Sequence, residues 1–439
     1  MLDASTRKTR TQRSQQTALA IFAAALAVRL MFCFVAVPVL NLKTGPSQAD
    51  FYDSTDGYIN IAANLVENGR FAFSADAPPT TYRAPVFPFA VAIVYAIIGN
   101  LGTAVLITNC IASALTCVVV LWIGRALVGD RAGFLLATPA ILFPLSIYYC
   151  ASSFSDTFVA LTVSLYALAL LKLFQTSTRG GSMKCGLAFA LAALTKAVVV
   201  PIPVLICAYA AARRRAALRP AVASMLIGFA VVGLWTARNY QATGRFVLIT
   251  GGSGYNALIG NFMIDESADC DTSLAYGRAR AREYIDEHAG RSIETADLRP
   301  TGFLDIPPDI DRLYGRSAAR MMYDSPGLLF RKLAVNALRF WYFSSGPTKS
   351  LANAIVNGLV LLFALAGAAA LLRERRMELE VLGLIVVAFV VLYSLIIVHS
   401  SRFCLPMVMV LLPMAAWGAL RVLGLFRAPA VCVTADRQI

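Results

Sequence analysis

The sequence predicts an all-α integral membrane protein with about ten or eleven transmembrane helices, helices lying on the membrane surface and two outer loops. Of its 439 residues, 58% are hydrophobic and 15% are charged, whereas soluble domains average about 45–50% and about 25%. The apolar residues form long runs, and basic residues gather between them. The net charge of +14 therefore reflects orientation in a membrane and does not indicate a nucleic acid partner.

The N-terminal segment 1–16 carries four basic residues, and the run 17–40 that follows is almost wholly apolar. This run is too long for the core of a signal peptide and lacks a cleavage site of small residues, so we expect an uncleaved first span with a cytoplasmic N-terminus. Further apolar runs cover 85–99, 103–124, 132–149, 154–174, 184–195, 197–212, 220–236, 351–372, 379–398 and 404–424. A transmembrane domain is thus expected over 17–424, followed by the tail 425–439.

Basic residues orient the remaining spans, because positive charge accumulates on the cytoplasmic side. Three basic segments, 172–184, 213–219 and 373–376, mark cytoplasmic turns. The segments 38–84 and 241–350 then become outer, periplasmic loops. The second loop holds 13 of the 25 acidic residues and only two of the lysines.

The expected spans conflict at one place. Alternation from the basic turns puts Asp156 outside, whereas counting forward from the first span with every run spanning puts it inside. Either the run 85–99 is re-entrant, or the region of Pro139 and Pro144 does not cross cleanly. We give weight to the basic turns.

The first outer loop carries several carboxylates just before an amphipathic helix predicted at 57–68. Tyr58 and other apolar residues share one face of this helix, so we expect it to lie on the membrane surface. Asp56 suits the N-cap of the helix. Alternatively, Asp53 or Asp56 is a general base at the lipid–water boundary, where a low dielectric raises the pKa of a carboxyl group.

Charged residues also lie at other predicted membrane boundaries. Asp156 begins an apolar run, where it is either an N-cap or a functional carboxylate, since a charge so near hydrocarbon is costly. Four cations, Arg83, Lys196, Arg238 and Arg402, are expected on the outer side, against the usual bias. They either bind lipid headgroups or converge on the phosphate of a lipid-linked substrate.

The second outer loop contains two weaker signals. The glycines of 250–261 resemble an anion-binding nest, but no strand–helix context supports a phosphate loop. A second surface helix is predicted from Asp324 to Phe343. Its apolar face is expected to contain Phe330, Leu333, Ala334, Ala337, Leu338 and Trp341, with Arg331, Lys332 and Arg339 as its basic residues.

Taken in order, these motifs resemble the polytopic GT-C-fold glycosyltransferases that use polyprenyl-phosphate sugars. This group includes the protein O-mannosyltransferases, the lipid A aminoarabinose transferases and bacterial proteins similar to dolichyl-phosphate-mannose-protein mannosyltransferases. The matching stretches are DGYINIAANLVENGRF, YRAPVFPF, SSFSD, GLAFALAALTKAVVVP, WTARNYQATGRFVLITGGSGYNALIGN, MYDSPGLLFRK and SRFCLP. They extend from about residue 20 to 415.

The resemblance implies a catalytic carboxylate in the first outer loop. Both Asp53 and Asp56 are candidates because neither has the usual spacing to Tyr58, and Asp53 is slightly favoured because Asp56 is the better cap. Asp156 matches the second acidic site of the family. The residues implied to bind substrate are Tyr58, Tyr82, Arg83, Lys196, Arg238, Asn239, Tyr240, Asn261, His399 and Arg402.

The implied activity is transfer of a sugar, with inversion, from undecaprenyl or decaprenyl phosphate to a glycolipid, polysaccharide or protein acceptor. The site would face the periplasm from a bacterial inner membrane. The nearest relatives use no cofactor, although some members of the wider fold use a divalent cation. With two histidines and no CxxC pair, the sequence itself predicts no metal site. A transporter or flippase is the alternative from another class, but no internal repeat supports it.

Overall fold

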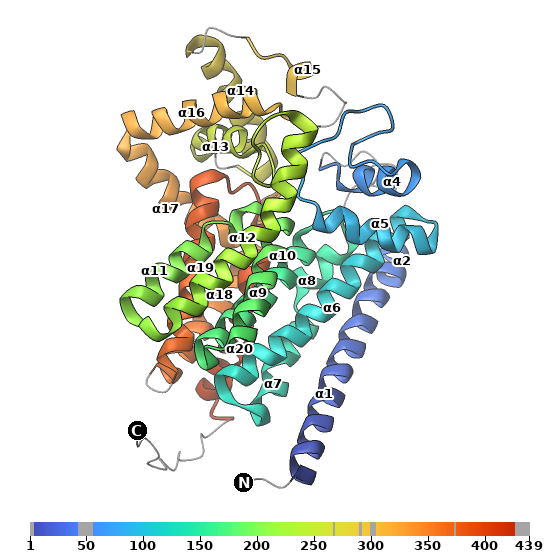
Figure 1. Ribbon diagram of the computed structural model, residues 1–439, viewed down its shortest axis with the longest axis vertical. Helices are drawn as coiled ribbons and strands as arrows, with labels where there is room; N and C mark the ends of the chain where they lie inside the picture. The colour runs from blue at the N-terminus through green and yellow to red at the C-terminus, as the bar shows by residue number, and fades with distance from the viewer. Residues whose placement is uncertain are drawn as a thin grey trace.

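In the computed structural model, residues 4–42, 56–266, 268–288, 292–298, 304–372 and 375–425 are described, and every regular element within them is helical. Figure 1 shows long helices packed side by side, with shorter helices forming a layer at one end of the bundle and α1 starting at the other end. The expected all-α membrane fold is confirmed.

Among the described residues, seven helices are long and apolar enough to cross a membrane, or eight if one bent pair counts as a single span. These helices are α1 (Ala4–Met31, continued to Val39 through η1 and α2), α6 (Leu101–Val128), α9 (Asp156–Thr176), α12 (Arg215–Thr243), α18 (Pro347–Leu371), α19 (Arg376–Ile396) and α20 (Leu405–Val422). The number is lower than the ten or eleven expected.

Three apolar runs account for the difference. The runs 85–99, 184–195 and 197–212 lie in the helices α5 (Val86–Ile98), α10 (Arg179–Thr195) and α11 (Ile202–Arg213). These helices have 13, 17 and 12 residues, and a perpendicular crossing needs about 20.

The bent pair consists of α7 (Asp130–Ile141) and α8 (Pro144–Tyr148), which continues into η2 (Tyr149–Ala151). The two halves meet at 51°. Pro144 has no N–H to continue the hydrogen-bond ladder, so the helix ends before it. The break agrees with the expectation that this region does not cross cleanly, and α5 is also too short for a perpendicular crossing, so both alternatives stay open.

Helices α18 and α20 approach each other very closely. A Cβ atom on Gly418 would lie 2.0 Å from the carbonyl oxygen of Phe363, and one on Gly367 would lie 2.0 Å from that of Met414. Only glycine fits at such a backbone contact. The contact holds the C-terminal half of α20 against that of α18.

The two polar segments form the layer at one end of the bundle (Figure 1). The first contains α4 (Tyr58–Asn68), and the second contains α13 (Ser253–Phe262), α14 (Cys270–His288), α15 (Thr295–Leu298), α16 (Pro308–Asp324) and α17 (Pro326–Tyr342). They share one apolar core, in which Phe71, Phe73 and Tyr82 of the first segment pack with residues of α13, α14 and α16.

The predicted surface helix forms as α17, and it packs on its neighbours through basic residues while part of its expected apolar face stays exposed. Lys332 and Arg339 are buried, whereas Phe330 and Leu338 are 70% and 68% exposed. Lys332 Nζ donates to the carbonyl of Ala257, and Arg339 donates to backbone carbonyls that follow α13. The long cationic side chains thus satisfy carbonyls inside the outer layer, and two of the large apolar side chains face outward.

Candidate active site

Two carboxylates share one guanidinium at the base of the outer layer. Nη2 of Arg402 lies 3.6 Å from Oδ2 of Asp56, and Nε of Arg402 lies 3.6 Å from Oδ2 of Asp156. Arg83 contacts Asp56 from another side, with Nη2 3.3 Å from Oδ1, and its Nε donates to the backbone carbonyl of Asp56. The four residues come from segments up to 346 positions apart in the sequence.

Asp56 owes its position to Gly57, which is the N-cap of α4 and adopts a left-handed conformation with φ of +64°. Phe73 packs against Gly57 so closely that a Cβ atom would lie 2.3 Å from its ring. The carboxylate of Asp56 therefore turns away from the helix end and makes no cap hydrogen bond. The interpretation of Asp56 as the N-cap was wrong. Asp53, the other candidate, lies outside the described residues.

Asp156 is the first residue of α9 and is only 4% exposed. The loop before it is held by Asn109 of α6, whose Nδ2 donates to the carbonyl of Ser152 at 2.8 Å. Thr157 Oγ1 donates in turn to Oδ1 of Asn109 at 2.6 Å. Ser155 is the N-cap residue, without a side-chain hydrogen bond, and Asp156 pairs with Arg402 instead of capping α9.

Arg402 lies in η5 (Ser401–Cys404), at the start of α20. The N–H of Ser401 donates to the carbonyl of Phe343 at 2.6 Å, and Asn353 Nδ2 donates to Ser401 Oγ at 2.8 Å. The guanidinium carbon lies 3.9 Å from the centroid of Phe154, a cation–π contact. These contacts hold the arginine between the two carboxylates.

The charges strongly affect the two titratable neighbours of Arg402. Burial alone would raise the pKa of Asp56, but Arg402 and Arg83 hold it at about 2. Burial, helped by Arg402, lowers the pKa of His399 to about 3, so this imidazole is neutral at pH 7. Its Nε2 lies 3.3 Å from Arg402 Nη2, and its buried Nδ1 has no hydrogen-bond partner in the described part of the chain.

Lys196 and Tyr58 complete the surroundings of the charged cluster. Lys196 is the C-cap of α10, and its Nζ lies 5.4 Å from the ring centroid of Phe403. The guanidinium of Arg83 lies 5.2 Å from the ring of Tyr58 and 4.5 Å from that of Tyr82. Six of the ten substrate-binding residues expected from the resemblance thus lie around the carboxylates: Tyr58, Tyr82, Arg83, Lys196, His399 and Arg402.

Of the other four residues, three make structural contacts elsewhere and one is exposed. Arg238 donates to the backbone carbonyls of Thr80 and Phe71, and Asn239 donates to those of Val247 and Ile249. Tyr240 is 58% exposed. Asn261 is buried, donates to the carbonyl of Ala318 and accepts from Lys332. The structure does not bring these side chains to the carboxylate cluster.

The glycine-rich stretch at 250–261 binds a carboxylate of the protein itself. The backbone N–H of Tyr255 donates to Oδ1 of Asp311 at 2.8 Å, and N–H groups of Gly252 and Gly254 also lower the pKa of that carboxyl group, although burial raises it overall. The anion held by these N–H groups is therefore the side-chain carboxylate of Asp311 in α16.

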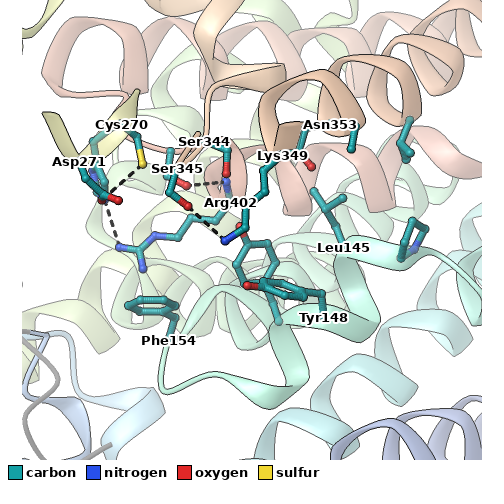
Figure 2. A pocket seen from close by; sticks show the side chains of 16 residues that line it. Leu145, Tyr148, Phe154, Cys270, Asp271, Ser344, Ser345, Lys349, Asn353 and Arg402 are labelled. Carbon is teal, nitrogen blue, oxygen red and sulfur yellow. Dashed lines mark hydrogen bonds between the residues drawn. The ribbon is translucent and has the colours of Figure 1, made fainter. Parts of the chain in front are cut away.

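A cavity of about 560 Å³ begins at Arg402 and His399. One part of its wall is apolar, and the other presents charged and hydroxyl groups. Its lining residues are Pro144, Leu145, Tyr148, Tyr149, Phe154, Cys270, Asp271, Ser344, Ser345, Lys349, Ala352, Asn353, Val356, His399, Ser400 and Arg402. Figure 2 shows the guanidinium of Arg402 above Phe154, with Asp271 near it and with Lys349 and Asn353 farther along the cavity.

Lys349 and Asp271 were not among the residues expected from the sequence. Lys349 lies in the first turn of α18, and its Nζ donates to Ser345 Oγ at 3.4 Å. No described carboxylate pairs with Lys349 at ion-pair distance. An unpaired cation at the start of a predicted span, on the outer side, is the signal that could have identified it.

The bundle with its outer helical layer has the GT-C fold. Residues 82–235 match the family model for dolichyl-phosphate-mannose-protein mannosyltransferases. The expected resemblance to the GT-C glycosyltransferases is therefore confirmed. A search of curated proteins gives no match.

Similar solved structures include the oligosaccharyltransferase of Archaeoglobus fulgidus in its apo form, with 15% identity, a TM-score of 0.56 and coverage of 94% of this chain and 51% of that one. The same enzyme with an inhibitory peptide and a dolichol-phosphate gives 13% identity, a TM-score of 0.57, and coverage of 96% and 52%. This chain spans about half the length of that enzyme. ArnT from Cupriavidus metallidurans bound to undecaprenyl phosphate gives 16% identity and a TM-score of 0.39, covering 92% and 78%.

Proposed function

We propose that this protein is a membrane glycosyltransferase that moves a sugar from a polyprenyl-phosphate donor to an acceptor on the periplasmic face of a bacterial inner membrane. The observation that carries the proposal is the arrangement of Asp56 and Asp156 around Arg402, at the end of a cavity that is partly apolar and partly cationic. The family match over 82–235 supports the same class of reaction.

The cavity suits an amphipathic, anionic donor. Pro144, Leu145 and Val356 offer an apolar wall to the prenyl chain, while Lys349 and Arg402 offer cations to its phosphate. A guanidinium binds phosphate oxygens through two parallel hydrogen bonds, and its charge stabilises the negative charge that grows on the leaving phosphate.

Asp56 is the proposed general base. The acceptor oxygen or nitrogen attacks the anomeric carbon and its proton passes to Asp56, while the bond from that carbon to the phosphate oxygen breaks. The electron pair leaves with the polyprenyl phosphate, and a single displacement of this kind inverts the anomeric centre. In the structure Arg402 and Arg83 keep the pKa of Asp56 at about 2, which makes it a weak base. A donor phosphate that draws Arg402 away would raise the pKa of Asp56 and strengthen the base.

Asp156 is assigned a positioning role, because it is nearly fully buried and contacts Arg402 through Nε. The sequence slightly favoured Asp53 as the base, on the ground that Asp56 would cap α4. Because Gly57 is the N-cap of α4, Asp56 has no capping role that would argue against it as the base. The proposed reaction needs only side chains of this protein.

The test uses the purified protein in nanodiscs with radiolabelled polyprenyl-phosphate sugars and a crude envelope extract as the source of acceptor. We expect release of free polyprenyl phosphate, and a loss of about 10²- to 10⁴-fold in turnover for Asp56→Asn. Asp309→Asn is the matched control, since Asp309 pairs with Arg245 on the surface of the outer layer. Normal turnover by Asp56→Asn would exclude Asp56 as the base, and movement of intact labelled lipid between leaflets without bond cleavage would indicate a flippase.

A further inference from the structure

Arg29 is a cation inside the first long helix that the proposed chemistry does not use. Its side chain is fully buried, between α1, α6 and the break that separates α7 from α8. A buried charge in such a place is costly unless all of its donors are satisfied. The arrangement around Arg29 meets that condition.

All five N–H groups of the Arg29 guanidinium have acceptors, and none of these acceptors is a carboxylate. Nε donates to Ser113 Oγ at 2.6 Å, Nη1 to the carbonyls of Ala25 and Ile141 at 3.0 Å each, and Nη2 to the carbonyl of Ala140 at 3.1 Å and to Ser146 Oγ at 3.2 Å. A planar fork with five donors fits this set, and a lysine, with three donors on a single atom, does not.

Two of these acceptors are the carbonyls that the helix break leaves without partners. In a continuous helix the carbonyl of Ala140 would accept from the N–H of residue 144, but Pro144 has no N–H. The carbonyl of Ile141 loses its partner because Phe143 is extended, with ψ of 116°. Arg29 donates to both carbonyls, and Cys117 Sγ also donates to that of Ala140 at 3.3 Å. The positive charge of Arg29 lies at the carboxyl end of α7, where the helix dipole favours it.

The second half of the broken helix leads directly to the candidate active site. Ser146 of α8 contacts Arg29 and also Ser113, and its carbonyl accepts from Cys150 Sγ at 3.1 Å. Leu145, Tyr148 and Tyr149 line the cavity, and the chain reaches Asp156 a few residues later.

We propose that Arg29 is a positioning residue: its guanidinium replaces the donor that Pro144 lacks, fixes the break between α7 and α8, and so sets the cavity wall and the segment that presents Asp156. The link to catalysis rests on the proposed function, whereas the effect on the break does not.

The break is tested by alkylating the purified protein in nanodiscs with N-ethylmaleimide and measuring each cysteine by mass spectrometry. Cys150 follows α8 and therefore reports on the break. Cys185 is equally buried but lies in α10, so it reports on the rest of the fold. We expect Cys150 to react about tenfold faster in Arg29→Met, and less so in Arg29→Lys, with Cys185 unchanged. Arg125→Met is the control, because Arg125 of α6 donates to Ser14 of α1 away from the break.

Two results would overturn the effect on the break: Cys150 stays protected in Arg29→Met, or Cys185 opens together with it. If Arg29→Met does not fold, Ser146→Ala removes one acceptor while keeping the charge, and the same comparison of Cys150 with Cys185 decides.

The link to the active site is tested by turnover of the polyprenyl-phosphate sugar. We expect kcat to fall roughly tenfold or more in Arg29→Met, to recover partly in Arg29→Lys and to stay unchanged in Arg125→Met. An unchanged kcat in Arg29→Met with an exposed Cys150 would overturn the link. A failure of the proposed function is recognised separately, because the wild type would then release no polyprenyl phosphate while the alkylation pattern would still report on the break.

Discussion

His399 and Arg402 face each other with Nε2 and Nη2 3.3 Å apart, and only the arginine carries a charge at neutral pH. The neutral imidazole can accept from the guanidinium and leaves the charge of Arg402 free for anions. A protonated His399 would place a second cation against the first.

This relationship predicts an acid-dependent loss of stability. The pKa of His399 falls from its ordinary 6.5 to about 3 on folding, so between these values the unfolded chain binds more protons. Stability is therefore lost as the pH falls from about 6.5 towards 3. In His399→Gln, the fall in melting temperature between pH 6.5 and 4.5 should be smaller by about 2 °C or more, as measured by scanning fluorimetry. An identical fall in wild type and variant would contradict the assignment.

The ion pair between Arg402 and Asp156 predicts strong coupling between the two positions. Arg402→Ala should destabilise the protein by about 3–5 kcal/mol, because it leaves the buried Asp156 without its cation. Adding Asp156→Asn should restore part of that loss. Melting temperatures of the two single variants and the double variant form the cycle that measures the coupling, and purely additive effects would argue against a direct pair.

The contact between α18 and α20 predicts a position-specific effect of alanine. Gly418→Ala forces a Cβ atom onto the carbonyl of Phe363 and should cost about 1–3 kcal/mol, lowering the melting temperature by about 2 °C or more. Gly358→Ala, in the partner helix α18, meets nothing within 4 Å and should leave the melting temperature unchanged or higher. Equal effects of the two substitutions would mean that the helices separate without cost.

The cavity predicts a specific role for Lys349 in binding the donor. Lys349→Gln should raise the KM for the polyprenyl-phosphate sugar about tenfold with little change in kcat, because a contact made equally in the ground state and transition state affects binding alone. Steady-state kinetics in nanodiscs measure both constants. Arg320→Gln is a suitable control, since the Arg320 side chain is 81% exposed on the outer layer. A fall in kcat at unchanged KM would move Lys349 from binding to the chemical step.

The sequence predicts the helical membrane fold and names all four charges at the centre of the site, because apolar runs and charges at their ends are local signals. The prediction from sequence fails where the role of a side chain depends on the backbone conformation of a single residue. Asp56 looks like a cap until Gly57 is known to be left-handed, and that depends on the packing of Phe73 from a distant turn. The number of spans is overestimated because an apolar composition does not distinguish a full crossing from the short helix α5.

Other parts of the site could not be read from the sequence because distant segments form them. The resemblance implies substrate-binding roles for Arg238 and Asn239, yet their side chains donate to backbone carbonyls. Lys349 and Asp271 reach the cavity only because α14 and α18 both begin near α8. The contact of Arg29 with the carbonyls that precede Pro144 is an intermediate case, since the proline predicts a free carbonyl but not which side chain will satisfy it.

The paired glycines of α18 and α20 have a consequence for how the cavity changes its width. Lys349 and Asn353 belong to α18, and Arg402 directly precedes α20, so these three residues are carried by helices whose backbones touch. These three residues form one wall of the cavity, and we expect that wall to be rigid. The opposite wall contains residues of α8, and α8 is joined to α7 by a bend instead of a continuous helix. If the proposed donor binds here, a bulkier prenyl chain is expected to displace α8 more easily than the helices that carry Lys349 and Arg402.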